Sequence, residues 1–266
     1  QALIMIASAT VLLVLMMSEL GGFSAFLSKF EAQHSGLLTI PSEGGTWSLN
    51  MFIGLALPWF FFCLSNPQVS QRFFIPESVK AMKQMLGGFL IFGFAYTLIA
   101  VLWGFGALLL VPGLENADMA TPTLLAMPFI PRALALVAMI GIVAAAVSTI
   151  DSILLTLSSV WARDVYKGVI RRDATEAREL KIGQWVIPIM ALIALLFAWQ
   201  ASTKSGLDFM IAPLSAAASA GLLMVVPTIF GAFYWKRGTA AGSVASILVG
   251  AAVVLVLQVT GAKPLG

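Results

Sequence analysis

The chain has 266 residues, of which 60% are apolar and only 10% are charged, and its mean hydropathy is +0.98. Soluble domains carry about 25% charged residues, so this composition excludes an ordinary soluble fold and indicates an integral membrane protein. The net charge of +3 is small and does not indicate nucleic-acid binding, and the single cysteine, Cys63, excludes an intrachain disulfide.

Seven apolar segments follow one another along the chain, and each predicts a transmembrane helix. Their approximate ranges are 2–20, 49–66, 85–111, 132–163, 184–200, 207–234 and 240–260. We therefore expect an all-α integral membrane protein in which residues 1–266 form a single transmembrane domain. The chain enters its first segment at once, without a basic leader, which leads us to expect a fragment of a longer protein.

Basic residues are unevenly divided between the two sides of these segments. Eleven lie after the second, fourth and sixth segments, whereas the other side holds four: Lys29, Arg132, Lys204 and Lys263. The positive-inside rule then places the start of the first segment in the cytoplasm and the C-terminus of the chain outside. We expect a multi-pass protein of the plasma (inner) membrane.

The second segment carries two signals for an interrupted helix. Pro58 lacks a backbone N–H and can break a helix, and Asn66-Pro67 marks the end of the segment. A helix broken near the middle of the membrane offers free backbone groups to a solute. The aromatic run that follows Pro58 is equally typical of core or lipid-facing packing, so its role stays open.

The fourth segment carries a stripe of hydroxyl groups. At 100° per residue, a face about 100° wide holds the side chains of Ser148, Thr149, Ser152, Thr156 and Ser159, and Asp151 lies on its flank. One interpretation is helix packing, in which hydroxyls bond to carbonyls one turn earlier. The other is a cation site, because hydroxyl and carbonyl oxygens suit a hard cation such as sodium and an intramembrane carboxylate is a functional candidate.

The stripe lies within AAAVSTIDSILLTLSSVWARDVYK (144–167), which resembles the signature of the sodium/solute symporter family of proline, pantothenate, sugar and monocarboxylate symporters. The stretches 66–84 and 227–250 resemble further segments of that family, in the same order. The resemblance implies the leucine-transporter fold, with the second inverted repeat and flanking helices present here. The first four core helices have no counterpart, and we expect them in the same or a partner chain.

The resemblance also implies an ion site. Ser148 and Thr149 match the two sodium-ligating hydroxyl residues of the family, and Ala145 matches the residue that offers a carbonyl. Because the family varies at the position of Asp151, we expect Asp151 and Ser152 to tune the site rather than to bind the ion.

A solute cavity is implied by the same match. Trp59, Phe62 and Cys63 match cavity-lining positions, where aromatic side chains favour a small, partly apolar carboxylate or amino-acid-like solute over a sugar. Arg72 lies at the cytoplasmic end of this segment. We expect a gating or structural role for it, either paired with Asp164 or facing water.

These features predict sodium-coupled symport of a small organic solute by alternating access, in a lipid bilayer and without a nucleic-acid partner. Sodium is the expected coupling ion, and no other cofactor is expected. Enzyme chemistry has no support, because we find no nucleophile–histidine pairing and no glycine-rich phosphate loop. Two alternatives stay open: a transporter-like sensor domain, and the non-transporting half of a split transporter.

Overall fold

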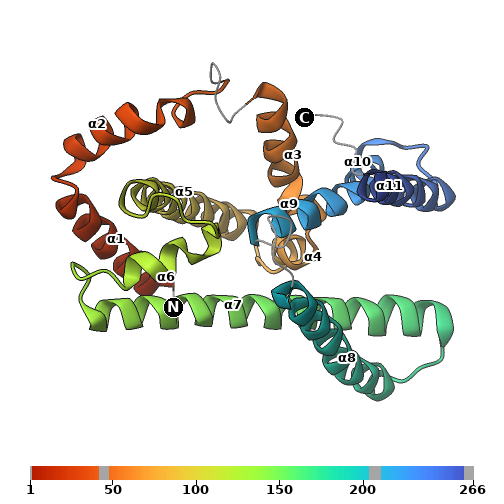
Figure 1. Cartoon of the computed structure of the whole chain (residues 1–266). Coiled ribbons are helices and arrows are strands. Elements are labelled where there is room, and N and C mark those ends of the chain that lie inside the picture. Colours follow the sequence, from red (N-terminus) through yellow and green to blue (C-terminus); the bar gives the residue numbers. More distant parts are fainter. Residues whose placement is uncertain (1, 42–47, 204–210, 261–266) are drawn as a thin grey trace. The chain divides into compact units, whose positions relative to one another are not determined.

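The computed structural model describes residues 2–41, 48–203 and 211–260, and every regular element within these ranges is helical (Figure 1). Six helices in this part of the chain are long and apolar enough to cross a membrane. The number rises to seven if the bent pair Leu49–Ser65 and Pro67–Phe74 forms one span. The prediction of an all-α membrane fold with about seven spans is therefore confirmed.

The helices group into two compact units, each built from two separate stretches of chain. Unit 1 contains residues 1–22 and 83–209, and unit 2 contains residues 23–82 and 210–266. The elements of unit 1 are α1 (Ala2–Glu19), α5 (Val79–Leu110, of which residues 79–82 belong to unit 2), η3 (Ala117–Met119), α6 (Ala120–Leu125), α7 (Arg132–Val160), η4 (Trp161–Ile170) and α8 (Glu176–Thr203). The elements of unit 2 are α2 (Phe23–His34), η1 (Ser35–Leu37), α3 (Leu49–Ser65), α4 (Pro67–Ser70), η2 (Gln71–Phe74), α9 (Ile211–Leu222), η6 (Leu223–Val225), α10 (Val226–Tyr234) and α11 (Ala240–Thr260).

The core of unit 1 lies where α1, α6 and α7 meet. Its buried residues are Leu12, Leu125, Ile130 and Ala138, and Trp103 of α5 packs against them. Met16 of α1 is fully buried, and it occupies the space beside Gly106 of α5 that a Cβ atom would need. Apolar side chains from four helices therefore hold α7, the helix with the hydroxyl stripe, against α1 and α5.

Helix α7 continues beyond its predicted end, and α8 begins before its predicted start. Residues Trp161–Ile170 form a π-helix, closed by the bond from the Arg171 N–H to the Tyr166 carbonyl at 2.7 Å. Helix α8 begins at Glu176 rather than at 184 and packs back along η4 and α7. Its charged first turn carries Glu176 and Glu179, which favour a helix N-terminus but lie outside any apolar run.

In unit 2, helix α3 packs against α9 and α10. The ring of Phe61 meets that of Phe230 edge-on, with centroids 6.0 Å apart. Helix α11 approaches η6 so closely that a Cβ atom on Gly250 would lie 2.8 Å from the Cβ of Met224. The predicted segment 207–234 is divided here into α9, η6 and α10, and its residues 207–210 lie outside the described part of the chain.

The end that Asn66-Pro67 predicts for this segment is found there, whereas the break that Pro58 could cause is not. Helix α3 runs through Pro58 without a break, whereas a bend of 48° separates Ser65 from Pro67. The backbone of Asn66 is extended, and its side-chain oxygen accepts the N–H of Gln68 at 3.0 Å. An Asn cap followed by proline at the first helical position starts a new helix, which explains why the bend lies there.

Candidate functional site

The three residues predicted to bind sodium lie within one turn of α7. The Ser148 and Thr149 hydroxyls both donate to the carbonyl oxygen of Ala145, each at 2.9 Å. Because their hydrogens point at this carbonyl, the lone pairs of both hydroxyl oxygens are turned away from it. Three neutral oxygen atoms are thus gathered on one patch of the helix surface.

The hydroxyl stripe continues along the helix as a ladder of similar bonds. Ser152 donates to the carbonyl of Ser148 at 2.9 Å, and Thr156 donates to the carbonyl of Ser152 at 2.8 Å. Bonds of this kind satisfy a hydroxyl inside a membrane without a second helix. The ladder is therefore compatible with both interpretations of the stripe, packing and ion binding.

The hydroxyl residues of α7 differ in burial. Thr156 and Ser158 are only 5% and 2% exposed, whereas Ser148 and Thr149 are exposed along with Asp151. Thr156 and Ser158 therefore pack inside the protein, although Ser159, next to η4, is exposed. Ser148 and Thr149 lie on a face of α7 that the other described helices of unit 1 leave open.

Asp151 lies beside the oxygen patch, on the exposed side of α7. Its carboxylate has no hydrogen bond or ion pair within the described ranges, and it lines an open groove with Ser148, Val147 and Ala144. Ser152, by contrast, is half-buried and bonded to the Ser148 carbonyl. The Asp151 carboxyl group therefore lies about one turn from Ser148, beside the patch without belonging to it.

The residues predicted to line the solute cavity lie on α3, in unit 2. The rings of Trp59 and Phe62 are 5.2 Å apart between centroids, and Cys63 carries a free, half-buried thiol. Trp59 is 53% exposed. On the helix wheel Trp59 and Cys63 lie opposite Phe61, the residue that packs on α10. This face of α3 is therefore partly open, with Trp59 exposed and with Phe62 and Cys63 half-buried.

The two residues predicted to form a gate lie in different units. Arg72 is exposed in η2 of unit 2, and Asp164 is exposed in η4 of unit 1. Their pairing stays a prediction.

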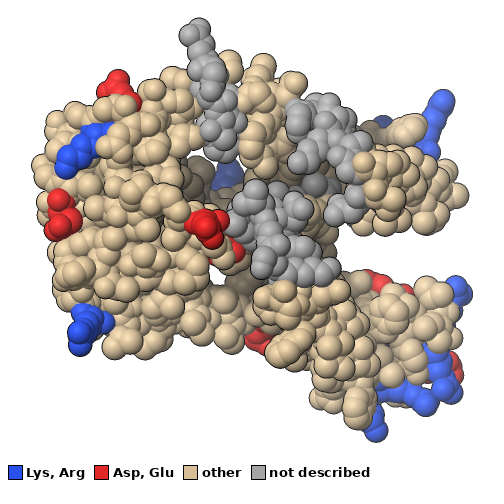
Figure 2. Space-filling view, in the orientation of Figure 1, with Lys and Arg blue, Asp and Glu red and all other residues tan. Residues whose placement is uncertain are grey.

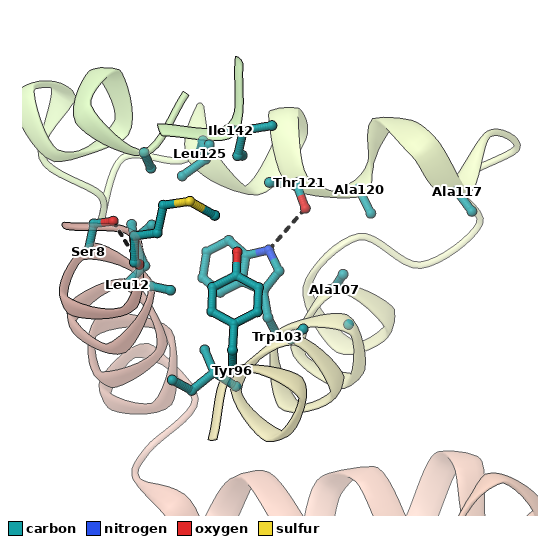
Figure 3. Close-up of a pocket in the computed structure, with 16 residues that line it drawn as sticks. Ser8, Leu12, Tyr96, Trp103, Ala107, Ala117, Ala120, Thr121, Leu125 and Ile142 are labelled. Atoms are coloured by element: carbon teal, nitrogen blue, oxygen red, sulfur yellow. Dashed lines mark hydrogen bonds between the residues drawn. The ribbon is translucent and has the colours of Figure 1, made fainter. Parts of the chain in front are cut away.

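Unit 1 also contains a cavity of about 360 Å³ that the sequence did not reveal (Figure 3). Ser8 and Leu12 line it from α1, and the rings of Tyr96 and Trp103 rise into it from α5. The Trp103 indole N–H donates to the hydroxyl of Thr121 at 3.2 Å, which ties α6 to α5. In the sequence, the cavity could have been suspected only from Tyr96 and Trp103, which lie two turns apart on an apolar helix. Such a spacing is equally common in ordinary core packing.

Comparison with known proteins agrees with this architecture. The family model described as the sodium:solute symporter family matches residues 1–250. The chain is 30% identical to a monocarboxylic acid transporter of Corynebacterium glutamicum over 211 residues, which cover 75% of this chain and 36% of the relative. It is 26% identical to the sodium/proline symporter of Haemophilus influenzae over 260 residues, which cover 92% of this chain and 48% of the relative.

A third relative is the high-affinity proline transporter PutP of Bacillus subtilis, which is 33% identical over 117 residues, or 44% of this chain and 24% of the relative. The chain thus spans half or less of the length of these three curated relatives. No solved structure matches it. With a family model that extends over residues 1–250, the chain belongs to the sodium:solute symporter family.

Proposed function

We propose that the protein to which this chain belongs is a transporter that couples uptake of a small organic solute to sodium entry by alternating access. The observation that carries the proposal is the convergence of the Ser148 and Thr149 hydroxyls on the Ala145 carbonyl, each at 2.9 Å. These residues hold three oxygens on an exposed part of a membrane-spanning helix.

The chemistry of the patch suits sodium. Sodium takes neutral and charged oxygen ligands, and a hydroxyl that donates its hydrogen elsewhere still offers its lone pairs to a cation. The patch offers no imidazole or thiolate, the ligands that transition metals prefer. Asp151, which lines the same groove as Ser148 about one helical turn away, would add favourable charge in a medium of low dielectric constant. The remaining ligands would come from helices of the same or a partner chain.

The solute we propose is a small carboxylate or an amino acid. Two of the relatives are named as proline transporters and one as a monocarboxylic acid transporter, and both kinds of solute carry a carboxylate. The partly open face of α3 offers Trp59, Phe62 and Cys63, which suit the apolar part of such a molecule better than a polyhydroxyl sugar. The bend at Asn66 supplies a helix break next to this face.

The decisive experiment is uptake by the full-length protein in proteoliposomes. Labelled proline, acetate, pyruvate and glucose are offered with an inward gradient of sodium or of choline. We expect uptake of proline or of a monocarboxylate in sodium only, with no uptake of glucose. Equal uptake in sodium and choline for every solute would overturn the sodium proposal, and sodium-dependent glucose uptake would overturn the solute proposal.

A further inference from the structure

The turn between α7 and α8 encloses a pocket of about 450 Å³ that plays no part in the ion or solute sites. It lies where two candidate membrane spans end, Arg132–Ile170 and Glu176–Gln200. Lysine and arginine side chains gather around this turn, at the lower right of Figure 2. The pocket therefore lies at the level where the hydrocarbon of a bilayer gives way to lipid headgroups.

Two helix faces form the walls of the pocket, and each changes from apolar to charged along its length. On α7 and η4 the lining residues run from Leu155 through Ala162 to Arg163 and Lys167. On α8 they run in the opposite direction along the chain, from Ile187 through Gly183 to Glu176. The thirteen residues from Leu155 to Lys167 make twelve steps, which span at most about 18 Å at the α-helical rise of about 1.5 Å per residue. The pocket is therefore apolar at its membrane end and charged at its outer end, as an amphipathic ligand requires.

The outer end of the pocket carries two cations and two carboxylates, and one of each forms an ion pair. Lys167 and Glu179 form an ion pair at 2.7 Å and so neutralise each other. Arg163 and Glu176 also line the pocket, but neither belongs to an ion pair within the described part of the chain. One cation and one carboxylate are therefore left to bind a ligand that carries both signs of charge.

We propose that this pocket binds phosphatidylethanolamine. The phosphate would bind Arg163, the ammonium group would donate to Glu176, and the acyl chains would extend along Leu155 and Ile187. Arginine binds phosphate through charge-assisted hydrogen bonds, and the free carboxylate adds a partner for an ammonium group, so the balanced charges of the pocket suit a zwitterionic headgroup. Phosphatidylglycerol has no cation for Glu176, and the trimethylated nitrogen of phosphatidylcholine has no hydrogen to donate. This proposal does not depend on sodium coupling.

The test measures which lipid the protein retains. The full chain is purified in detergent and mixed with equal amounts of phosphatidylethanolamine, phosphatidylglycerol and phosphatidylcholine that share the same acyl chains. Bound lipid is then counted by native mass spectrometry. We expect about tenfold more phosphatidylethanolamine than either competitor, the factor that one charge-assisted hydrogen bond supplies. Equal retention of the three lipids, or a preference for phosphatidylglycerol, would overturn the proposal.

Two substitutions separate the two contacts. Glu176→Gln should remove the preference for phosphatidylethanolamine over phosphatidylglycerol, whereas Arg163→Gln should lower retention of both lipids about tenfold. Asp173→Asn and Arg172→Gln make the same charge changes on the same turn but outside the pocket lining, and they should leave retention unchanged. If the control pair alters selectivity as much as the pocket pair, the general charge of the turn is responsible and the pocket is not the site.

A soluble headgroup distinguishes a lipid site from a site for a free phosphate compound. Glycerophosphoethanolamine carries the same charges but no acyl chains, so we expect it to compete at least a hundredfold less well than the lipid. Competition at equal concentration would show that the apolar walls contribute nothing, and it would overturn the assignment to a lipid.

Discussion

Ser148 and Thr149 share one hydrogen-bond acceptor, the carbonyl oxygen of Ala145, and each hydroxyl lies 2.9 Å from it. Adjacent residues on a helix point about 100° apart, so their side chains do not normally meet. Here both hydroxyls turn back by one helical turn to the same oxygen. This shared bond fixes the two rotamers and holds the oxygens in place before any ion binds.

Thr149→Ala should weaken activation by sodium. Removing one neutral oxygen ligand leaves the ion short of a partner and costs about 1–3 kcal/mol. At 1.4 kcal/mol per factor of ten, the half-saturating sodium concentration should rise about 5- to 150-fold. Thr149→Ser keeps the oxygen and should change it much less. The measurement is the sodium dependence of uptake by the full-length protein.

Thr156→Ala is the matched control, because this hydroxyl lies on the same stripe and makes the same kind of bond at 2.8 Å. Thr156 is only 5% exposed, so its loss should reduce the free energy of unfolding by about 1 kcal/mol. Sodium activation should stay within about twofold of the unmodified protein. Equal shifts in sodium activation for the two alanine variants would assign the whole stripe to packing and remove the ion site.

Gly250→Leu should destabilise unit 2. A Cβ atom at this position would lie 2.8 Å from the Cβ of Met224 and 3.3 Å from its Cα, so α11 would have to move away from η6. Overpacking of this kind costs about 1–3 kcal/mol and should lower the melting temperature in detergent. Gly231→Leu is the control, since a Cβ atom there meets no other atom within 4 Å. If the two variants have the same melting temperature, the close approach of α11 to η6 does not contribute to stability.

The spans could be predicted from sequence because a run of about twenty apolar residues has few alternatives in a membrane protein. Where helices end was harder, because their ends follow local hydrogen bonds rather than hydropathy. Helix α8 starts at Glu176, in a charged stretch that no apolar window includes. The end of α3 at Asn66 was predicted from Asn66-Pro67, but Pro58 does not break the helix, and the bend lies where the Asn66 side chain caps the helix that follows.

For the candidate site, too, some features could be predicted from the sequence and others could not. The helix wheel placed Ser148, Thr149 and Thr156 on one face, and this follows from helical geometry alone. It could not show that Thr156 is buried while Thr149 is exposed, because burial depends on how other helices such as α8 pack against α7. The pocket at Arg163 and Glu176 was also beyond prediction, since it requires two residues on different helices to face each other.

The bond between Trp103 and Thr121 should contribute measurably to the stability of unit 1. The indole N–H of Trp103 donates to the Thr121 hydroxyl at 3.2 Å and links α5 to α6 across 18 residues of chain. A double-mutant cycle with Trp103→Phe and Thr121→Val removes the bond while keeping most of the apolar volume. We expect a coupling free energy of about 0.5–1.5 kcal/mol from melting curves. Strictly additive single effects would show that the bond contributes nothing.

The orientation of the chain in the membrane can be tested with introduced cysteines. The 11:4 division of basic residues predicts that the stretches 67–84 and 164–183 are cytoplasmic. In a Cys63→Ser background of the full-length protein, Glu77→Cys and Thr175→Cys should resist an impermeant maleimide in intact cells and react once the cells are permeabilised. Glu77 is a better position for the introduced cysteine than Ser78, because the Ser78 hydroxyl accepts the N–H of Ala81 at 3.2 Å and caps α5.

Gln33→Cys is the control for the opposite side of the membrane. Gln33 is exposed near the end of α2, in a stretch predicted to lie outside the cell, and the cysteine should react in intact cells. Ready labelling at Glu77→Cys and Thr175→Cys together with protection at Gln33→Cys would invert the topology. The phosphatidylethanolamine pocket would then face the outside of the cell.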